Sequence, residues 1–129
     1  MKAILDTNFI ISVIKNKIRL FEDLEELYEV SEIVVPVEVL TELEKIMQSK
    51  DTTREEKEAA RLAEFMIKKK NLTMTPLGTP DVDAGLIRYC VQEHCIVATL
   101  DRELKEKIKK KAPASKFLTI KGKNRIGLE

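Results

Sequence analysis

Short apolar runs alternate with longer segments of helical periodicity along this chain. Four of the runs are rich in apolar residues and have the length of buried strands: 2–6 (KAILD), 32–35 (EIVV), 95–100 (CIVATL) and 116–120 (KFLTI). A fifth strand is predicted at the start of 72–80 (LTMTPLGTP), whose later residues are typical of a loop. The pattern therefore predicts strands that alternate with helices.

The segments between the predicted strands place apolar residues three and four positions apart, as amphipathic helices do. The predicted helices span 8–17, 20–28, 36–47, 51–70, 80–94 and 101–111. Pro36 fits the first turn of its helix. Segment 51–70 begins with capping residues and ends in lysines, as the helix dipole favours. The tail 121–129 has no clear pattern.

The order of these elements indicates an α/β fold. Buried strands separated by helices are typical of a parallel sheet that is covered on both faces. We expect a three-layer α/β/α sandwich with a central, mostly parallel five-stranded sheet, formed by residues 1–129 as a single domain. Ligands of such sheets bind at the carboxyl ends of the strands.

Four acidic residues are predicted to meet at that edge of the sheet. Asp6 and Asp101 each come at the end of a predicted strand. Glu42 lies about two turns into the helix that follows the second strand. Asp83 lies in the first turn of a later helix, and both helices leave from the edge where their strands end. Each acid also has an ordinary interpretation, because Asp6 and Asp101 could cap helices and charged helix residues usually face water.

Carboxylates that converge in this way repel one another, and their pKa values rise unless a cation neutralises them. Oxygen ligands without histidine or cysteine partners favour Mg²⁺ or Mn²⁺ over Zn²⁺. Such a cation lowers the pKa of an attacking water and shields phosphoryl oxygens, and two cations could stabilise both the attacking and the leaving oxygen. The pattern therefore predicts metal-dependent phosphate chemistry.

Composition adds few constraints. The net charge is only +1, with 23 basic and 22 acidic residues, so any basic surface must come from local segregation of charge. Cys90 and Cys95 show no metal-ligand spacing and are expected to be reduced thiols of a cytoplasmic protein. No apolar run is long enough to span a bilayer, so no membrane partner is expected.

Four segments in order resemble the PIN domain, a family of Mg²⁺/Mn²⁺-dependent ribonucleases: LDTN, VEVLTELEK, GTPDVDAGLIRYC and CIVATLDRELKEKI. The last segment is the most specific of them. Within the family, the chain looks most like the branch that processes small-subunit ribosomal RNA precursors, and less like the VapC-type toxins.

The resemblance implies that Asp6, Glu42, Asp83 and Asp101 form the catalytic and metal-binding quartet, and that Asn8 and Thr99 support these ligands. The chain departs from the family pattern in two places. Many relatives have Asn where this chain has Leu100. Relatives in the rRNA-processing branch often carry adjacent acids near the third motif, whereas Val82 separates Asp81 from Asp83 here, which leaves open whether Asp81 touches metal.

The basic residues of the last third are candidates for RNA contact, because the helix that carries them begins at Asp101. We expect Arg102, Lys105 and Lys109 to bind phosphates of the RNA backbone there. The default interpretation of such residues is a helix face that is exposed to solvent. The only histidine, His94, has no partner at ligand spacing and is expected to lie at a helix end.

The activity implied is endonucleolytic cleavage of RNA, probed best with precursor ribosomal RNA, with 5′-phosphate and 3′-hydroxyl products. Alternatives are a toxin ribonuclease of a toxin–antitoxin pair and a non-catalytic module that binds RNA or protein. A haloacid-dehalogenase-like phosphatase is disfavoured, because position 8 is Asn rather than Asp. The apolar faces of the first two helices either support a homodimer or belong to the core.

Overall fold

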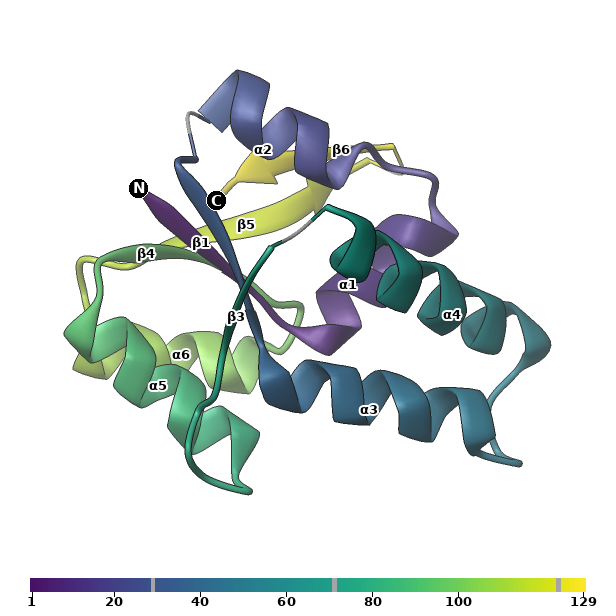
Figure 1. The fold of residues 1–129 in the computed structure, drawn as a ribbon. Helices are drawn as coiled ribbons and strands as arrows, with labels where there is room; N and C mark the ends of the chain where they lie inside the picture. The colour runs from purple at the N-terminus through teal and green to yellow at the C-terminus, as the bar shows by residue number, and fades with distance from the viewer. Residues whose placement is uncertain (29, 71, 123) are drawn as a thin grey trace.

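The centre of the molecule is a mostly parallel β-sheet. The computed structural model describes residues 1–28, 30–70, 72–122 and 124–129, and within them the sheet has the strand order β3-β2-β1-β4-β5-β6 (Figure 1). The strands are β1 (Lys2–Leu5), β2 (Glu32–Pro36), β3 (Thr73–Thr75), β4 (Cys95–Ala98), β5 (Lys116–Lys121) and β6 (Arg125–Leu128). The pairs among β1 to β5 are parallel, which confirms the predicted sheet, and β6 is antiparallel to β5.

β6 lies in the C-terminal tail, where the sequence predicted no element. The chain turns after β5 at Gly122, whose φ of +63° favours glycine, and returns with Leu128 opposite Leu118. The tail offers only Ile126 and Leu128 as apolar residues, which is too short a pattern to show the period of a strand. The described sheet therefore has six strands instead of the five predicted.

Helices cover both faces of the sheet (Figure 1). They are α1 (Thr7–Lys15), α2 (Leu20–Tyr28), α3 (Val37–Gln48), α4 (Arg54–Lys69), α5 (Val82–Gln92) and α6 (Arg102–Lys111). None of the helices in the described part of the chain is long and apolar enough to cross a membrane.

The two layers of helices follow from the alternation of side chains along buried strands. Ala3 and Leu5 of β1 pack into the core beneath α1 to α4, whereas Ile4 packs into the second core beneath α5 and α6. Because both faces are covered, β1 is apolar at successive positions instead of alternating with polar ones. The predicted three-layer α/β/α sandwich is confirmed.

The apolar faces of α1 and α2 are part of this core. Phe9 and Ile10 of α1 and Leu24 of α2 are completely buried. These two helix faces therefore provide no surface for a homodimer, and a contact between two copies would have to use another part of the molecule.

Candidate active site

The carboxyl ends of β1 and β4 lie side by side at the centre of the sheet. Leu5 of β1 is in register with Ala98 of β4, and the backbone N–H of Asp6 donates a hydrogen bond of 2.9 Å to the carbonyl of Ala98. Asp6 and Asp101 therefore leave the sheet at the same edge, as the rule for parallel strands predicts.

A cavity of about 710 Å³ opens at this edge. Its walls include the four acids predicted from sequence, namely Asp6, Glu42, Asp83 and Asp101. They come from four separate segments: the end of β1, α3, the first turn of α5 and the loop after β4. The structure thus brings together residues from both ends of the chain.

Asp6 is the most deeply placed of the four and is held in one orientation. One carboxylate oxygen, Oδ1, accepts a hydrogen bond of 2.9 Å from the backbone N–H of Thr7, and Oδ2 accepts one of 2.8 Å from the hydroxyl of Thr99. Burial raises the pKa of Asp6 and the charges of Glu42 and Asp83 raise it further, whereas the two hydrogen bonds lower it. The carboxylate of Asp6 is therefore fixed in place in surroundings that disfavour its charge.

The loop after β4 is tied to Asp6 through Thr99. The hydroxyl of Thr99, which donates to Asp6, also accepts a hydrogen bond of 3.2 Å from the backbone N–H of Asp101. Asn8 supports the same loop, because its side-chain carbonyl accepts a hydrogen bond of 3.2 Å from the N–H of Leu100. Asn8 and Thr99, the two polar residues expected to support the acids, thus contact the segments that carry Asp6 and Asp101.

Asp101 and Asp81 both cap helices. Oδ1 of Asp101 accepts a hydrogen bond of 3.1 Å from the N–H of Leu104, and Oδ1 of Asp81 accepts one of 3.1 Å from the N–H of Ala84. Only Asp101 also lines the cavity, so capping and a role in the site are compatible for this residue. Asp81 is absent from the cavity wall and acts as the cap of α5.

Asp83 and Glu42 line the cavity from two different helices, α5 and α3. Burial raises the pKa of Asp83, and the charges of Asp101 and Asp81 raise it further. Glu42 lies half-buried on α3, while Glu38, one turn earlier, points elsewhere: its carboxylate accepts a hydrogen bond of 3.1 Å from the N–H of Leu77. Glu38 therefore anchors the loop before α5, and Glu42 is the acid that α3 presents to the cavity.

The cavity wall also includes polar residues that sequence reasoning missed. They are Ser12 and Lys15 of α1, Asn16 at the C-cap of α1, and Glu55 and Glu56 of α4. Ser12 and Lys15 lie four and seven positions after Asn8, so helical spacing could have placed them on the same face. No such signal existed for the two glutamates, because they reach the cavity only through the packing of α4 beside α1.

The donor set fits a hydrated divalent cation. Six carboxylates line the cavity. Burial raises the pKa of Asp6 and Asp83, and the charges of neighbouring carboxylates raise it further, which is a cost that a bound cation relieves. In the part of the chain that the structure describes, no three acidic, histidine or cysteine side chains are close enough to form a direct ligand group. Oxygen ligands spread around a roomy cavity suit Mg²⁺ or Mn²⁺, because such ions usually keep several of their waters.

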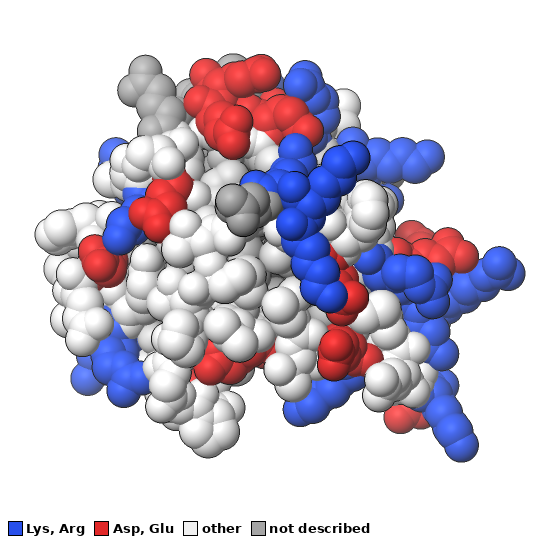
Figure 2. Space-filling view, in the orientation of Figure 1, with Lys and Arg blue, Asp and Glu red and all other residues white. Residues whose placement is uncertain are grey.

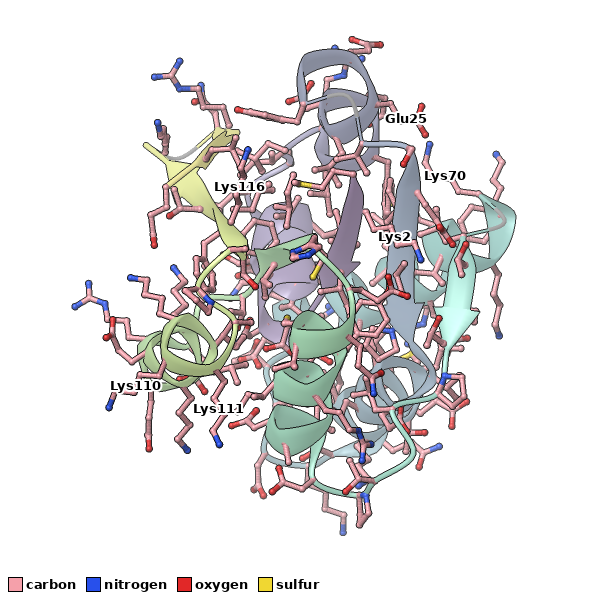
Figure 3. The ribbon with its side chains drawn as sticks, turned by 90° about the vertical axis from the view of Figure 1, so that its left-hand side faces the viewer. Lys2, Glu25, Lys70, Lys110, Lys111 and Lys116 are labelled. Atoms are coloured by element: carbon pink, nitrogen blue, oxygen red, sulfur yellow. The ribbon has the colours of Figure 1, made fainter. Side chains whose placement is uncertain are left out.

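The basic residues predicted to contact RNA lie on α6, outside the cavity wall. Lys105 is buried and forms an ion pair of 2.8 Å with Glu129, and Lys109 lies over the ring of Phe117, 5.6 Å from its centroid. Both side chains therefore have roles in holding α6 to the sheet. Arg102 is exposed at the start of α6, and Figure 3 shows Lys110 and Lys111 extending outward from the end of the same helix.

The fold and the cavity define an α/β protein whose acidic site lies at the carboxyl edge of a parallel sheet. Comparison with known proteins then identifies the family: residues 3–118 match the model of the PIN like domain, and the chain belongs to this family. The resemblance of its four motifs to the PIN domain is thereby confirmed.

Two relatives extend the comparison. Ribonuclease VapC4 of Methanocaldococcus jannaschii is 37% identical over 109 residues, which cover 83% of this chain and 82% of VapC4. The structure of the PIN domain endonuclease Utp24 superposes with a TM-score of 0.79 at 26% sequence identity, covering 99% of this chain and 90% of that one. The chain is thus similar both to a VapC ribonuclease in sequence and to Utp24 in fold.

Proposed function

We propose that this chain is an endoribonuclease that depends on Mg²⁺ or Mn²⁺ and hydrolyses phosphodiester bonds in RNA. The observation that carries the proposal is the meeting of Asp6, Glu42, Asp83 and Asp101 in one cavity, each from a separate segment. The names of the relatives, a ribonuclease and an endonuclease, support the same activity.

The four acids would hold the cation. When bound, it would offset their negative charge, shield the phosphate oxygens and lower the pKa of an attacking water. Asp6 cannot turn away from the cavity, since both of its oxygens accept hydrogen bonds. Thr99 keeps Asp6 and the backbone of Asp101 at a fixed separation, so two of the ligands are in place before the cation or the RNA arrives.

Lys15 gives the cavity a positively charged group among its carboxylates. Its ammonium group is suited to bind a phosphate oxygen of an RNA strand that enters the cavity, which would partly offset the repulsion between the strand and the acids. The cavity is wide enough for a nucleotide, because small-molecule sites occupy roughly 300–1,000 Å³.

The test is cleavage of RNA by the purified chain with Mn²⁺, followed by sequencing of the RNA ends. We expect 5′-phosphate and 3′-hydroxyl ends, and we expect Asp6→Asn and Asp101→Asn to abolish cleavage while circular dichroism shows a folded protein. Asp81→Asn is the matched control, because Asn also caps helices and residue 81 lies outside the cavity wall. Cleavage that is unchanged in both cavity variants would reject the assignment.

For the substrate, we propose precursor ribosomal RNA, processed in the cytoplasm by residues 1–129 acting as one domain. The four sequence motifs and the likeness to Utp24 over 99% of the chain support this choice. The 37% identity to VapC4 favours a toxin ribonuclease as the second candidate.

Two measurements separate these candidates. Cuts that cluster at the ends of the mature small-subunit rRNA support processing, whereas growth arrest on expression, relieved by Asp101→Asn, supports a toxin. Calorimetric titration addresses the third alternative, a non-catalytic binding module: Mn²⁺ binding that is lost in Asp6→Asn argues against it.

A further inference from the structure

Two cysteines that the proposed nuclease site does not use lie against each other beneath α5. Cys90 is in the last turn of α5, and Cys95 is the first residue of β4. Their Sγ atoms are 3.7 Å apart, and the two residues are 3% and 0% exposed. Both belong to the apolar core between the sheet and the helices α5 and α6. The fold thus brings two free thiols into contact inside the protein.

The backbone on either side of the two thiols keeps them together. The N–H of Glu93 donates a hydrogen bond of 2.8 Å to the carbonyl of Tyr89, which ends α5 close to Cys90. Lys2 of β1 is in register with Cys95, so the start of β4 is held in the sheet. A disulfide requires the two Sγ atoms to come about 2.05 Å apart, which is roughly 1.7 Å closer than they are. Rotation of the two side chains with a small shift of the last turn of α5 would supply this approach.

The two thiols differ in how readily they ionise. The pKa of Cys95 is lowered, chiefly because the thiol of Cys90 hydrogen-bonds to its sulfur, and the positive charge of Lys2 contributes to this despite burial. The same hydrogen bond, together with burial, raises the pKa of Cys90. Cys95 is therefore the residue of the pair that forms a thiolate, and the thiolate is the form of cysteine that reacts with oxidants.

We propose that Cys90 and Cys95 are a redox-active dithiol that hydrogen peroxide converts into an intrachain disulfide. The thiolate of Cys95 attacks one peroxide oxygen, the O–O bond breaks, and the departing hydroxide takes up a proton to become water, which leaves a sulfenic acid on Cys95. The sulfur of Cys90 then loses its proton and attacks that of Cys95, the S–O bond breaks, and a second water departs as the S–S bond forms. The two sulfur atoms together lose the two electrons that reduce the peroxide, and a dithiol reductant reverses the change by thiol–disulfide exchange. The proposal does not depend on the proposed nuclease activity.

The oxidant reaches these buried thiols through local opening of the segment that joins them. Val91, Gln92 and His94 lie between the two cysteines and are exposed, so this short segment can open while the sheet stays folded. Figure 2 shows a mostly uncharged surface over α5, and hydrogen peroxide is itself small and uncharged. We therefore expect oxidation of the folded chain to be slow, because its rate is limited by this opening.

The disulfide would tie the end of α5 to the start of β4, and both elements lead to the acidic cavity at their other ends. Asp83 lies seven residues before Cys90 on α5, or about two helical turns, and Thr99 directly follows β4. The bond closes a loop of six residues, 90–95, and such a closure restricts the unfolded chain. Oxidation therefore stabilises the fold and fastens the helix that carries Asp83, without a chemical change in any of the four acids.

Mass spectrometry of the folded wild-type chain before and after hydrogen peroxide tests the proposal. After unfolding, iodoacetamide should label both cysteines of the untreated chain, neither cysteine of the oxidised chain, and both again after dithiothreitol. A protease that cuts after Glu93 separates the two cysteines, so the fragments that carry Cys90 and Cys95 should stay joined in the oxidised chain until dithiothreitol is added. The joined pair should weigh two hydrogen atoms less than the two separate fragments, and the protein should remain a single chain.

Single-cysteine variants separate the roles of the two thiols. Cys90→Ser retains a hydroxyl that can donate to Cys95, and it should accumulate a sulfenic acid that dimedone traps, whereas Cys95→Ser should give much less of this product. Both variants are also matched controls for stability, because peroxide oxidises their methionines as it does those of the wild type. Peroxide should raise the melting temperature of the wild type by about 5 °C or more, and should raise that of neither variant.

Four results would overturn the proposal. If both thiols of the folded wild type persist after peroxide treatment, the pair is an inert part of the core. Oxidation that proceeds to sulfinic or sulfonic acids, or that joins separate chains, would show that Cys90 does not capture the sulfenic acid of Cys95. A wild type with the same melting temperature in both redox states would show that the bond does not fasten α5 to the sheet.

Discussion

Thr99 connects the two acids that end neighbouring strands. Its wholly buried hydroxyl donates to Asp6 and accepts from the backbone of Asp101. One small side chain thus determines how a carboxylate on β1 is placed relative to the loop after β4. A β-branched residue at this position suits the strand, while the hydroxyl serves the site.

Replacement of Thr99 by valine keeps the shape of the side chain and removes the hydroxyl. We expect a loss of about 1–3 kcal/mol in unfolding free energy, because Asp6 then lacks a buried hydrogen-bond donor. We also expect Mn²⁺ affinity to fall about 10–100-fold, as for other residues that support metal ligands. Urea unfolding and calorimetry measure the two effects, and unchanged Mn²⁺ affinity would contradict the role assigned to the hydroxyl.

The raised pKa of Asp83 predicts that, without metal, the free energy of unfolding depends on pH. Burial raises the pKa of Asp83 in the folded protein above its value in the unfolded chain. The free energy of unfolding therefore falls as the pH rises from the unfolded-state pKa through the folded-state pKa, because ionised Asp83 is disfavoured in the folded protein. Asp83→Asn should therefore be more stable than the wild type at neutral pH with EDTA. The difference should vanish in acid, where residue 83 of the wild type is neutral in both states, and a constant difference between the two proteins would contradict this.

The sequence predicts that the acidic residues at the strand ends line the site, but it does not predict the other polar residues of the cavity wall. Asp6 and Asp101 follow recognisable strands, so the rule for the carboxyl ends of parallel strands predicts that they lie together. Glu55 reaches the same cavity only because α4 packs beside α1, and nothing local in its sequence signals that packing. The charge of Lys105 predicts RNA contact, and its ion pair with Glu129 is a further contact that the sequence did not indicate.

The position of α5 depends on two contacts that begin outside it. The carboxylate of Glu38 on α3 accepts a hydrogen bond from the backbone N–H of Leu77, and Leu77 lies against Gly85. A Cβ atom at position 85 would come within 2.7 Å of the Cβ of Leu77. The absence of a side chain at Gly85 thus allows α5 to approach the loop closely, and that approach sets where Asp83 lies.

Replacement of Gly85 by alanine should push α5 away from this loop. We expect a loss of about 1–3 kcal/mol in unfolding free energy, as in other overpacked sites, despite the better helix propensity of alanine. RNA cleavage should also fall, since Asp83 moves with α5. Val91→Ala on the exposed side of α5 should change the free energy by less than about 0.5 kcal/mol. Wild-type stability in Gly85→Ala would show that the contact is easily relieved.

At the scale of elements, the sequence predicted the order of strands and helices because each strand is a short apolar run that is buried on both faces. β6 was missed because its four residues include only two large apolar side chains, too few to show the period of a strand. The same limit applies to any edge strand that is stabilised mainly by one neighbour.

At the scale of the whole molecule, a cation that binds only the folded chain should raise its melting temperature. We expect Mn²⁺ to stabilise the wild type by about 2.7 kcal/mol at a free concentration of 100 times the dissociation constant. Asp6→Asn and Asp101→Asn should show little shift, while Asp81→Asn should behave like the wild type. Differential scanning fluorimetry with Mn²⁺ or EDTA measures this, and an equal shift in all four proteins would place the cation outside the cavity.

The two outer strands of the sheet also restrict how this molecule can aggregate. β3 has only three residues, and on β6 the carbonyl of Ile126 accepts a hydrogen bond of 3.1 Å from the hydroxyl of Tyr28. Neither edge strand therefore presents a long row of unpaired backbone groups with which a strand of another molecule can pair. We therefore expect the folded chain to recruit no further strand at either margin of its sheet.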